Sequence, residues 1–216
     1  MRTPFVYCVC LAMLMLGFST NAGAPPTDDL INYHDSGQYY QDICTTIRDA
    51  TYYMQFRLTQ NERSRTKRKL AIVMDIDETA LSNYEQLQRA HFQITPKMLE
   101  EIQRQSKGTA IPYTLALYNY AKDHGVDIFF ITGRHHSTTA HTLDNLAREG
   151  YRAWKQITFN PAHLSESTKA YRVLERRKIQ MAGYDIIMNI GNRSITLAGG
   201  AADMTFQLPN PYYHFG

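Results

Sequence analysis

The stretch Leu70–Asn83 reads LAIVMDIDETALSN, and it sets the fold of this chain. It begins with five apolar residues, Leu70–Met74, which are typical of a strand buried on both faces of a parallel sheet. The run then turns acidic and polar over residues 75–79. A buried parallel strand delivers the residues that follow it to the carboxyl edge of the sheet, where open α/β folds bind ligands. The stretch therefore predicts a core strand that ends at a binding edge.

Asp75 and Asp77 lie two residues apart, so in extended geometry both side chains leave the backbone on the same side. Two carboxylates on one side repel each other, which favours a bound cation or a shared proton. A solvated acidic turn that caps a helix, with Asp77 or Thr79 as the N-cap, explains this short run equally well. The partners that the rest of the chain supplies have to decide between the two interpretations.

Length and composition indicate one globular domain. The chain has 216 residues, enough for a full core and a small insertion. Its hydrophobic content of 44% and charged content of 20% exclude a disordered chain. The formal net charge of +3 is too small to argue for a nucleic-acid or membrane partner, so we expect neither.

Residues 1–24 have the pattern of a signal peptide. Arg2 supplies the positive charge, Phe5–Phe18 is an apolar run too short to span a membrane comfortably, and Ala22–Ala24 is a small-residue cleavage site. Removal of this segment leaves Cys44 as the one cysteine, so no internal disulfide is expected. We expect an exported protein, periplasmic or secreted, with no stable membrane insertion after cleavage; an uncleaved anchor is the alternative.

Strand and helix patterns alternate along the rest of the chain. Further strands are predicted at residues 126–131, 156–159, 185–190 and 205–208, and helices at 39–60, 95–105, 112–124, 137–149 and 168–181. Residues 25–38 are expected to be an irregular lead-in. Residues 82–111 are expected to form a small cap inserted over the sheet edge. This order predicts the α/β fold class: a Rossmann-like parallel sheet with flanking helices and right-handed crossovers.

Further candidate site residues lie at the ends of two predicted strands and at the start of one predicted helix. Thr132 and Arg134 come directly after the second predicted strand, Lys169 stands at a helix start, and Gly191-Asn192 follows the fourth strand. In a parallel sheet these positions share one edge with Asp75. An Asp can attack phosphorus and form an acyl-phosphate. The phosphoryl group then needs donors and positive charge, often from a divalent cation, to offset repulsion by that Asp.

The motifs together resemble the haloacid dehalogenase (HAD) superfamily. The residues that carry the resemblance are D-x-D-E-T at 75–79, I-T-G-R at 131–134 and the helix-start Lys169. The C-terminal F-Q-L-P-N-P-Y-Y at 206–213 resembles plant-type members of subfamily IIIB. That subfamily contains secreted acid phosphatases of bacteria, plant acid phosphatases and vegetative storage proteins. The resemblance covers residues 39–216 and implies an HAD-like phosphatase domain there.

This resemblance implies an acid phosphatase that hydrolyses small-molecule phosphate monoesters. Asp75 would be the nucleophile, Asp77 the general acid and then the base, Thr132 a hydrogen-bond donor to the phosphoryl group, and Lys169 its counter-charge. Glu78, Thr79, Gly133 and Arg134 are the expected substrate contacts. The implied cofactor is Mg²⁺, with Asp75, the backbone carbonyl of Asp77 and Asn192 as its expected ligands.

The chain departs from the family pattern at the fourth motif, usually Gly-Asp followed after three residues by a second Asp. Here Asn192 and Thr196 stand in the two acidic places, which weakens binding of a hard cation. Asp185 lies at the wrong end of its strand, and Asp203 would have to fold back. Two functions therefore stay open: a phosphomonoesterase with weak or altered metal use, and a phosphatase-like protein that binds a ligand or stores amino acids without turnover.

Overall fold

The computed structural model describes residues 25–161 and 168–214; the expected signal peptide lies outside them. The helices are α1 (Thr27–Asp35), α2 (Gln38–Arg63), α3 (Tyr84–Arg89), α4 (Pro96–Arg104), α5 (Pro112–Asp123), η1 (His136–Thr138), α6 (Thr139–Arg148), α7 (Thr168–Met181) and α8 (Ser194–Leu197). The strands are β1 (Lys69–Met74), β2 (Leu81–Ser82), β3 (Thr109–Ala110), β4 (Asp127–His135), β5 (Gln156–Asn160), β6 (Tyr184–Gly191) and β7 (Met204–Gln207).

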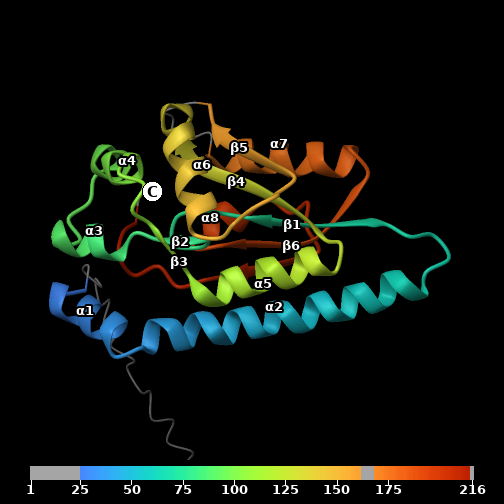
Figure 1. Ribbon diagram of the computed structural model, residues 1–216, viewed down its shortest axis with the longest axis horizontal. Helices are drawn as coiled ribbons and strands as arrows, with labels where there is room; N and C mark the ends of the chain where they lie inside the picture. Colours follow the sequence, from blue (N-terminus) through green and yellow to red (C-terminus); the bar gives the residue numbers. More distant parts are fainter. Residues whose placement is uncertain (1–24, 162–167, 215–216) are drawn as a thin grey trace, which may run out of the picture.

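The main sheet in the described residues has the strand order β5-β4-β1-β6-β7, and every neighbouring pair is parallel. The strand that the opening stretch predicts, β1, lies at its centre. Met74, the last residue of β1, is level with Phe130 of β4 and Ile190 of β6. The carboxyl ends of these strands face the end of the molecule that carries α3 and α4 (Figure 1). The predicted α/β parallel fold is confirmed.

Strand β1 is buried on both faces, which explains its unbroken apolar run. Ile72 and Met74 join a large core cluster with residues of α2 and α5. Ala71 and Val73 join a second cluster with Tyr171 of α7. Helices α2 and α5 cover one face of the sheet, and α7 covers the other (Figure 1). Full burial of an aliphatic side chain of this size contributes about 1.5–3 kcal/mol, so the two clusters hold the strand in place.

The segment expected to be an irregular lead-in forms helix α1 instead. Asp28 and Asp29 lie in its first turn, where negative charge is stabilised by the helix dipole. Leu30 is buried, and the Tyr33 hydroxyl donates a 2.6 Å hydrogen bond to Asp42 of α2. With one buried aliphatic residue, α1 has too weak an apolar period to be recognised from sequence. Its stability comes from packing against α2.

Strand β4 runs further than the apolar pattern predicts. The pattern ends at Ile131, whereas β4 continues to His135 and contains Thr132–Arg134. After a shift in register, His135 lies opposite Asn160 of β5. The polar residues are thus held by the sheet itself and not by a loop that follows it.

Residues between β1 and α5 form a small separate layer. Leu81 of β2 pairs antiparallel with Ala110 of β3, and α3 and α4 lie between these two strands in the sequence. The Thr95 hydroxyl caps α4 by accepting a 3.2 Å hydrogen bond from the Met98 N–H. Figure 1 shows α3 and α4 at the end of the molecule reached by the carboxyl ends of the strands.

Helix α2, with 26 residues, runs along the length of the sheet. Ile43, Ile47 and Met54 are buried, whereas Tyr52 and Phe56 are exposed. The buried residues of α2 recur every three or four positions, which is the spacing of a helix face packed on a core. Among the helices of residues 25–161 and 168–214, none is both long and apolar enough to cross a membrane.

Candidate active site at the carboxyl edge of the sheet

The turn that follows β1 is closed by one carbonyl. Ile76 accepts hydrogen bonds from the backbone N–H groups of Thr79 (3.2 Å), Ala80 (2.9 Å) and Leu81 (2.9 Å). Glu78 adopts a left-handed conformation, with φ at 46°, to complete the turn. A non-glycine residue there is strained by about 1 kcal/mol. The turn therefore fixes Asp75 and Asp77 relative to the end of the strand.

Asp75 lies directly beyond β1 and is buried between neighbouring strands. Its backbone N–H donates to the Ile190 carbonyl at 2.9 Å. Its Oδ1 accepts from the Ile76 N–H at 2.8 Å, and its Oδ2 lies 3.1 Å from Arg172 Nη2. Burial raises the pKa of Asp75, the charge of Arg172 opposes that rise, and the nearby charge of Asp77 adds to it. The two acids thus lie close enough to influence each other, as their spacing predicts.

Asp77 has a different set of partners. Arg134 binds it with both Nε and Nη2; the Nη2 atom lies 2.7 Å from Oδ1 and the Nε atom 3.1 Å from Oδ2. Gln103 of α4 donates to Oδ2 at 3.0 Å, and Asn83 donates to Oδ1 at 2.9 Å. Arg134 is 1% exposed and also donates to Thr142 at 3.1 Å. A two-pronged guanidinium and two amides therefore hold the Asp77 carboxylate in one orientation.

Arg172 of α7 is the cation that contacts Asp75. Its Nη1 donates to the Ile131 carbonyl at 2.5 Å, and the side chain is buried. Its Nε is also buried and has no hydrogen-bond partner among the described residues. At Gly133 an added Cβ would lie 3.4 Å from Arg172 Nη2, so the glycine leaves the space beside the guanidinium open. Arg172 thus brings a fixed positive charge to Asp75 and keeps one buried donor unpaired among the described residues.

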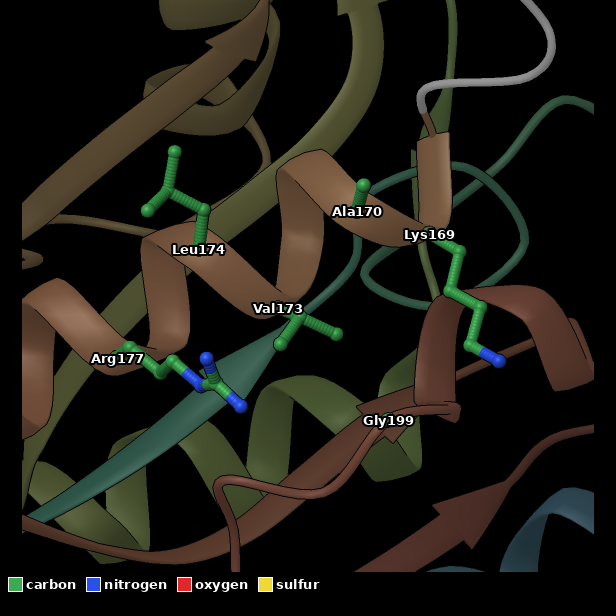
Figure 2. Close-up of a pocket in the computed structure, with 6 residues that line it drawn as sticks. All are labelled: Lys169, Ala170, Val173, Leu174, Arg177 and Gly199. Carbon is green, nitrogen blue, oxygen red and sulfur yellow. The ribbon is translucent and has the colours of Figure 1, made fainter.

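Lys169, the cation predicted from sequence for this place, lies elsewhere. It is exposed and lines an open hollow of about 530 Å³ with Val173, Arg177 and Gly199. Figure 2 shows Lys169, Val173 and Arg177 on the side of α7 that faces the segment carrying Gly199. The structure therefore places Arg172, one helical turn further along, where Lys169 was expected.

The side of α7 that packs on the core predicts which of its basic residues faces inward. Tyr171 and Ile179 are the bulky residues of α7 that join the core, and Arg172 and Arg176 follow the same helical face. All four are buried, whereas Lys169 is exposed. Anchoring the helical wheel on Tyr171 and Ile179 predicts an inward Arg172. Arg176 donates to the carbonyls of the segment that follows α8, and burial lowers its pKa to about 10.

The other predicted residues lie around these two ion pairs. Thr132 is fully buried, and its hydroxyl accepts a 3.1 Å hydrogen bond from the Arg134 N–H. Gly133 lies beside Arg172, as described above. Thr79 is buried, and its hydroxyl has no hydrogen-bond partner within the described residues. Thr132, Gly133 and Arg134 thus come together with Asp75 and Asp77 at one edge, and Thr79 lies on the turn between them and β2.

Glu78 points into the protein and not toward the open edge. It is 0% exposed, and its Oε1 accepts from the Asn83 N–H at 2.9 Å and from Asn83 Nδ2 at 3.0 Å. Its Oε2 accepts from the Tyr213 hydroxyl near the C-terminus. Burial, followed by the charge of Asp77, raises the pKa of Glu78 to about 7. Glu78 therefore supports the turn, and Tyr213 and Gln103 are site neighbours that no local sequence signal reveals.

The residues near Asp75 do not suit Mg²⁺. This ion prefers octahedral oxygen ligands that include carboxylates, but Arg172 already pairs with Asp75, and Arg134 pairs with Asp77. Asn192 is neutral, and the Thr196 hydroxyl donates to the Arg193 carbonyl at 2.7 Å. Residues 25–161 and 168–214 contain no group of three or more His, Cys, Asp or Glu residues that could hold a metal.

Asp185 and Asp203 do not supply the acidic ligands that are missing near Asp75. Both pair with Arg57 of α2, and Asp185 lies 2.9 Å from Arg57 Nη2. Asp185 is near the start of β6, and the Asp203 N–H donates to the Ile186 carbonyl just ahead of β7. The two acids therefore lie at the amino end of the strands, opposite Asp75. The loop that carries Asp203 does not fold back to the site.

Comparison with known proteins identifies the family of this chain. Residues 20–215 match the model of the HAD superfamily, subfamily IIIB (acid phosphatase). The stem 31 kDa glycoprotein of Glycine max is 29% identical over 195 residues, covering 88% of this chain and 73% of that protein. Vegetative storage protein 1 of Arabidopsis thaliana is 25% identical, covering 83% of this chain and 66% of that protein.

Among solved structures, the class C acid phosphatase from Bacillus anthracis has the same fold. It superposes with a TM-score of 0.70 at 20% identity, covering 87% of this chain and 86% of that one. A second structure of that protein, with tungstate bound, also has a TM-score of 0.70. With the family match extending over nearly the whole sequence, this chain belongs to subfamily IIIB of the HAD superfamily, the acid phosphatase subfamily.

Proposed function

We propose that this protein hydrolyses phosphate monoesters, with Asp75 as the nucleophile. The observation that carries the proposal is the buried Asp75 carboxylate, fixed at the carboxyl end of β1 and paired with Arg172 at 3.1 Å. Membership of an acid phosphatase subfamily supports it. A carboxylate held in one place by the sheet loses little entropy when it attacks a bound phosphorus centre.

In the first step, an Asp75 oxygen forms a bond to phosphorus while the ester P–O bond breaks. Asp77 donates a proton to the departing alcohol. In the second step, Asp77 accepts a proton from water as the water oxygen attacks the aspartyl-phosphate, releasing phosphate and free Asp75. Arg134 holds the Asp77 carboxylate in place for both proton transfers.

Arg172 takes the counter-charge role that the sequence suggested for Lys169. Its contact with Asp75 places positive charge where an attacking carboxylate and a phosphoryl group would repel each other. Thr132 and Gly133 lie on the neighbouring strand β4 and complete the floor of the phosphoryl site. Because the donor set does not suit Mg²⁺, the proposed steps use none.

We further propose that residues 82–111 act as a small cap over the sheet edge. Gln103 of α4 reaches Asp77, and Arg104 donates to the Ser137 carbonyl at 3.2 Å, so α4 contacts the segment after β4. A covered edge of this kind favours small phosphate monoesters. Export to the periplasm or the extracellular space is the accompanying proposal, and it rests on the signal pattern of residues 1–24.

The direct test is hydrolysis of an aryl phosphate by the purified mature protein. We expect turnover by the wild type and a loss of at least about a thousandfold in Asp75→Asn, since the nucleophile is removed while the shape is kept. Asp144→Asn is the matched control, because Asp144 is an exposed acid on α6 and pairs with Arg148. Equal rates for the wild type and Asp75→Asn would exclude Asp75 as the nucleophile.

A storage or ligand-binding protein without turnover is the second candidate. The specific observations that favour it are the replacement of two acids by Asn192 and Thr196 and the similarity to a vegetative storage protein. It predicts no hydrolysis with any metal in a panel of divalent ions, although the pocket can still bind phosphate. Hydrolysis that Asp75→Asn abolishes would rule it out.

A further inference from the structure

The two acids at the sheet edge are each neutralised by a buried arginine. Arg172 pairs with Asp75 and Arg134 with Asp77, and the side chains of the two arginines are 5% and 0% exposed. The formal charges of these four groups sum to zero. A bound divalent cation would add two positive charges, and the part of the chain that the structure describes has no group of three or more His, Cys, Asp or Glu residues that could hold it.

The positions beyond β6 do not supply that balance. Ile190 is level with Met74, and its carbonyl accepts a 2.9 Å hydrogen bond from the Asp75 N–H, so Gly191 and Asn192 follow directly from the strand beside Asp75. Asn192 offers an uncharged amide at this level. The Thr196 hydroxyl is turned to the Arg193 carbonyl at 2.7 Å. A hard cation would have to compete with Arg172 for the Asp75 carboxylate.

Arg172 has the features of a built oxyanion site. Its side chain is buried, its Nη1 is anchored on the Ile131 carbonyl, and its Nη2 is anchored on Asp75. Its Nε keeps an unused buried donor within the described part of the chain. A planar guanidinium with a free N–H matches the oxygens of a tetrahedral dianion. Gly133 adds no side chain on the Nη2 side.

We propose that the sheet edge around Asp75 and Arg172 binds phosphate-like oxyanions without a metal ion, and that Arg172 supplies the positive charge a cation would otherwise bring. The proposal deepens the phosphomonoesterase assignment and rests on it for the identity of the substrate. Arg172 then contacts both the nucleophile and the phosphoryl oxygens. The bound dianion is then hydrogen-bonded by Arg172 from the helix α7 side of the sheet.

The test of this proposal measures the binding of an oxyanion and not the rate of hydrolysis. Tungstate, a phosphate-like tetrahedral oxyanion, is titrated calorimetrically into the full mature protein in excess EDTA and again in excess Mg²⁺. We expect the two dissociation constants to agree within about twofold, and no saturable heat when Mg²⁺ alone is added. Tungstate affinity that falls about tenfold or more in EDTA and returns with Mg²⁺ would overturn the proposal, as would saturable binding of Mg²⁺ alone.

Substitutions in α7 test whether Arg172 binds the oxyanion. Arg172→Met is expected to weaken tungstate binding at least about tenfold, with Arg172→Lys intermediate because it keeps the charge and loses the planar fork. Arg177→Met is the control, since Arg177 is on the same helix and lines the open hollow. Undiminished binding by a folded Arg172→Met, verified by circular dichroism, would remove Arg172 from the site. The comparison with and without EDTA uses the wild type, so it tests metal-free oxyanion binding even where Arg172→Met does not fold.

The outcomes separate the two proposals. Metal-free tungstate binding together with absent hydrolysis would leave the oxyanion site intact and overturn the phosphomonoesterase assignment. Hydrolysis that requires Mg²⁺ would leave the enzyme assignment intact and overturn the metal-free site. A wild type that binds no tungstate under either condition overturns the oxyanion site.

Discussion

Glu78 is a buried acid whose ionisation depends on the fold. It is fully buried in the turn that carries Asp75 and Asp77, and it is fixed by Asn83 and Tyr213. Burial disfavours its charged form, and the neighbouring Asp77 charge adds to the effect, so its pKa rises from 4.5 to about 7. The unfolded chain binds this proton more weakly. Stability from Glu78 is therefore complete below pH 4.5 and is lost as pH rises through about 7.

This shift predicts the pH dependence of stability. The free energy of unfolding of the wild type should fall by roughly 3 kcal/mol across that window because of Glu78 alone. Glu78→Gln should remove most of this slope and be the more stable protein above about pH 7. The raised pKa of Asp75 acts in the same direction and accounts for a remaining slope.

Urea unfolding at a series of pH values measures the free energy of unfolding of the wild type and of Glu78→Gln. Glu85→Gln is the matched control, because Glu85 is an exposed glutamate of α3 that pairs with Arg89. It should keep the slope of the wild type. A Glu78→Gln protein with an undiminished slope would show that this carboxyl does not carry the raised pKa.

At the scale of elements, the connection from β6 to α8 decides the metal chemistry. A Cβ at Gly191 would lie 2.4 Å from Thr196 Oγ1, so Thr196 packs against the strand end that is level with Asp75. Arg176 donates to the Thr196 carbonyl at 3.2 Å and to the Ala198 carbonyl at 2.5 Å. Thr196 is therefore held beside Gly191, the residue after Ile190, whose carbonyl accepts from the Asp75 N–H.

The double change Asn192→Asp and Thr196→Asp should therefore create Mg²⁺ binding. Two added carboxylates beside Asp75 supply the charge and the oxygen ligands that a hard cation prefers. Calorimetry should show saturable Mg²⁺ binding in the double variant and none in the wild type, and hydrolysis should become Mg²⁺-dependent. Ser194→Asp, an exposed change in the same segment, is the control. A double variant without Mg²⁺ binding would mean that positions 192 and 196 do not converge on Asp75.

At the scale of the whole molecule, the C-terminal segment links the helical layer to the site. Tyr212 contacts the rings of Tyr39 on α2, Tyr84 on α3 and Phe92, at centroid distances of 5.4, 5.6 and 5.6 Å. The adjacent Tyr213 donates to Glu78. Two neighbouring tyrosines near the end of the chain thus pack against its N-terminal helices and its acidic turn.

Truncation of Tyr212 tests that link. Tyr212→Ala should lower the free energy of unfolding by about 3–5 kcal/mol, the range for removing a buried aromatic ring. Tyr212→Phe should be close to neutral, because the Tyr212 hydroxyl is buried without a hydrogen-bond partner among the described residues. Tyr52→Ala is the control, since Tyr52 is 62% exposed on α2. Similar denaturation midpoints for Tyr212→Ala and Tyr52→Ala would contradict the proposed link.

The order of elements and the place of the two acids follow from the sequence alone. The apolar run of β1 can be satisfied only by burial on both faces, and a buried parallel strand places Asp75 at the carboxyl edge. The strands expected near residues 126, 156, 185 and 205 are all present, as are the helices that alternate with them. These features are local, because side-chain period and turn chemistry are properties of neighbouring residues.

What surrounds the acids was decided by tertiary structure. The choice of Arg172 over Lys169 depends on how α7 is rotated on the sheet, which the packing of Tyr171 and Ile179 in the core sets. The pairing of Asp203 with Arg57 depends on where a loop after α8 meets α2. Contacts such as Gln103 with Asp77 join residues far apart in the chain, so only packing of the complete fold brings them together.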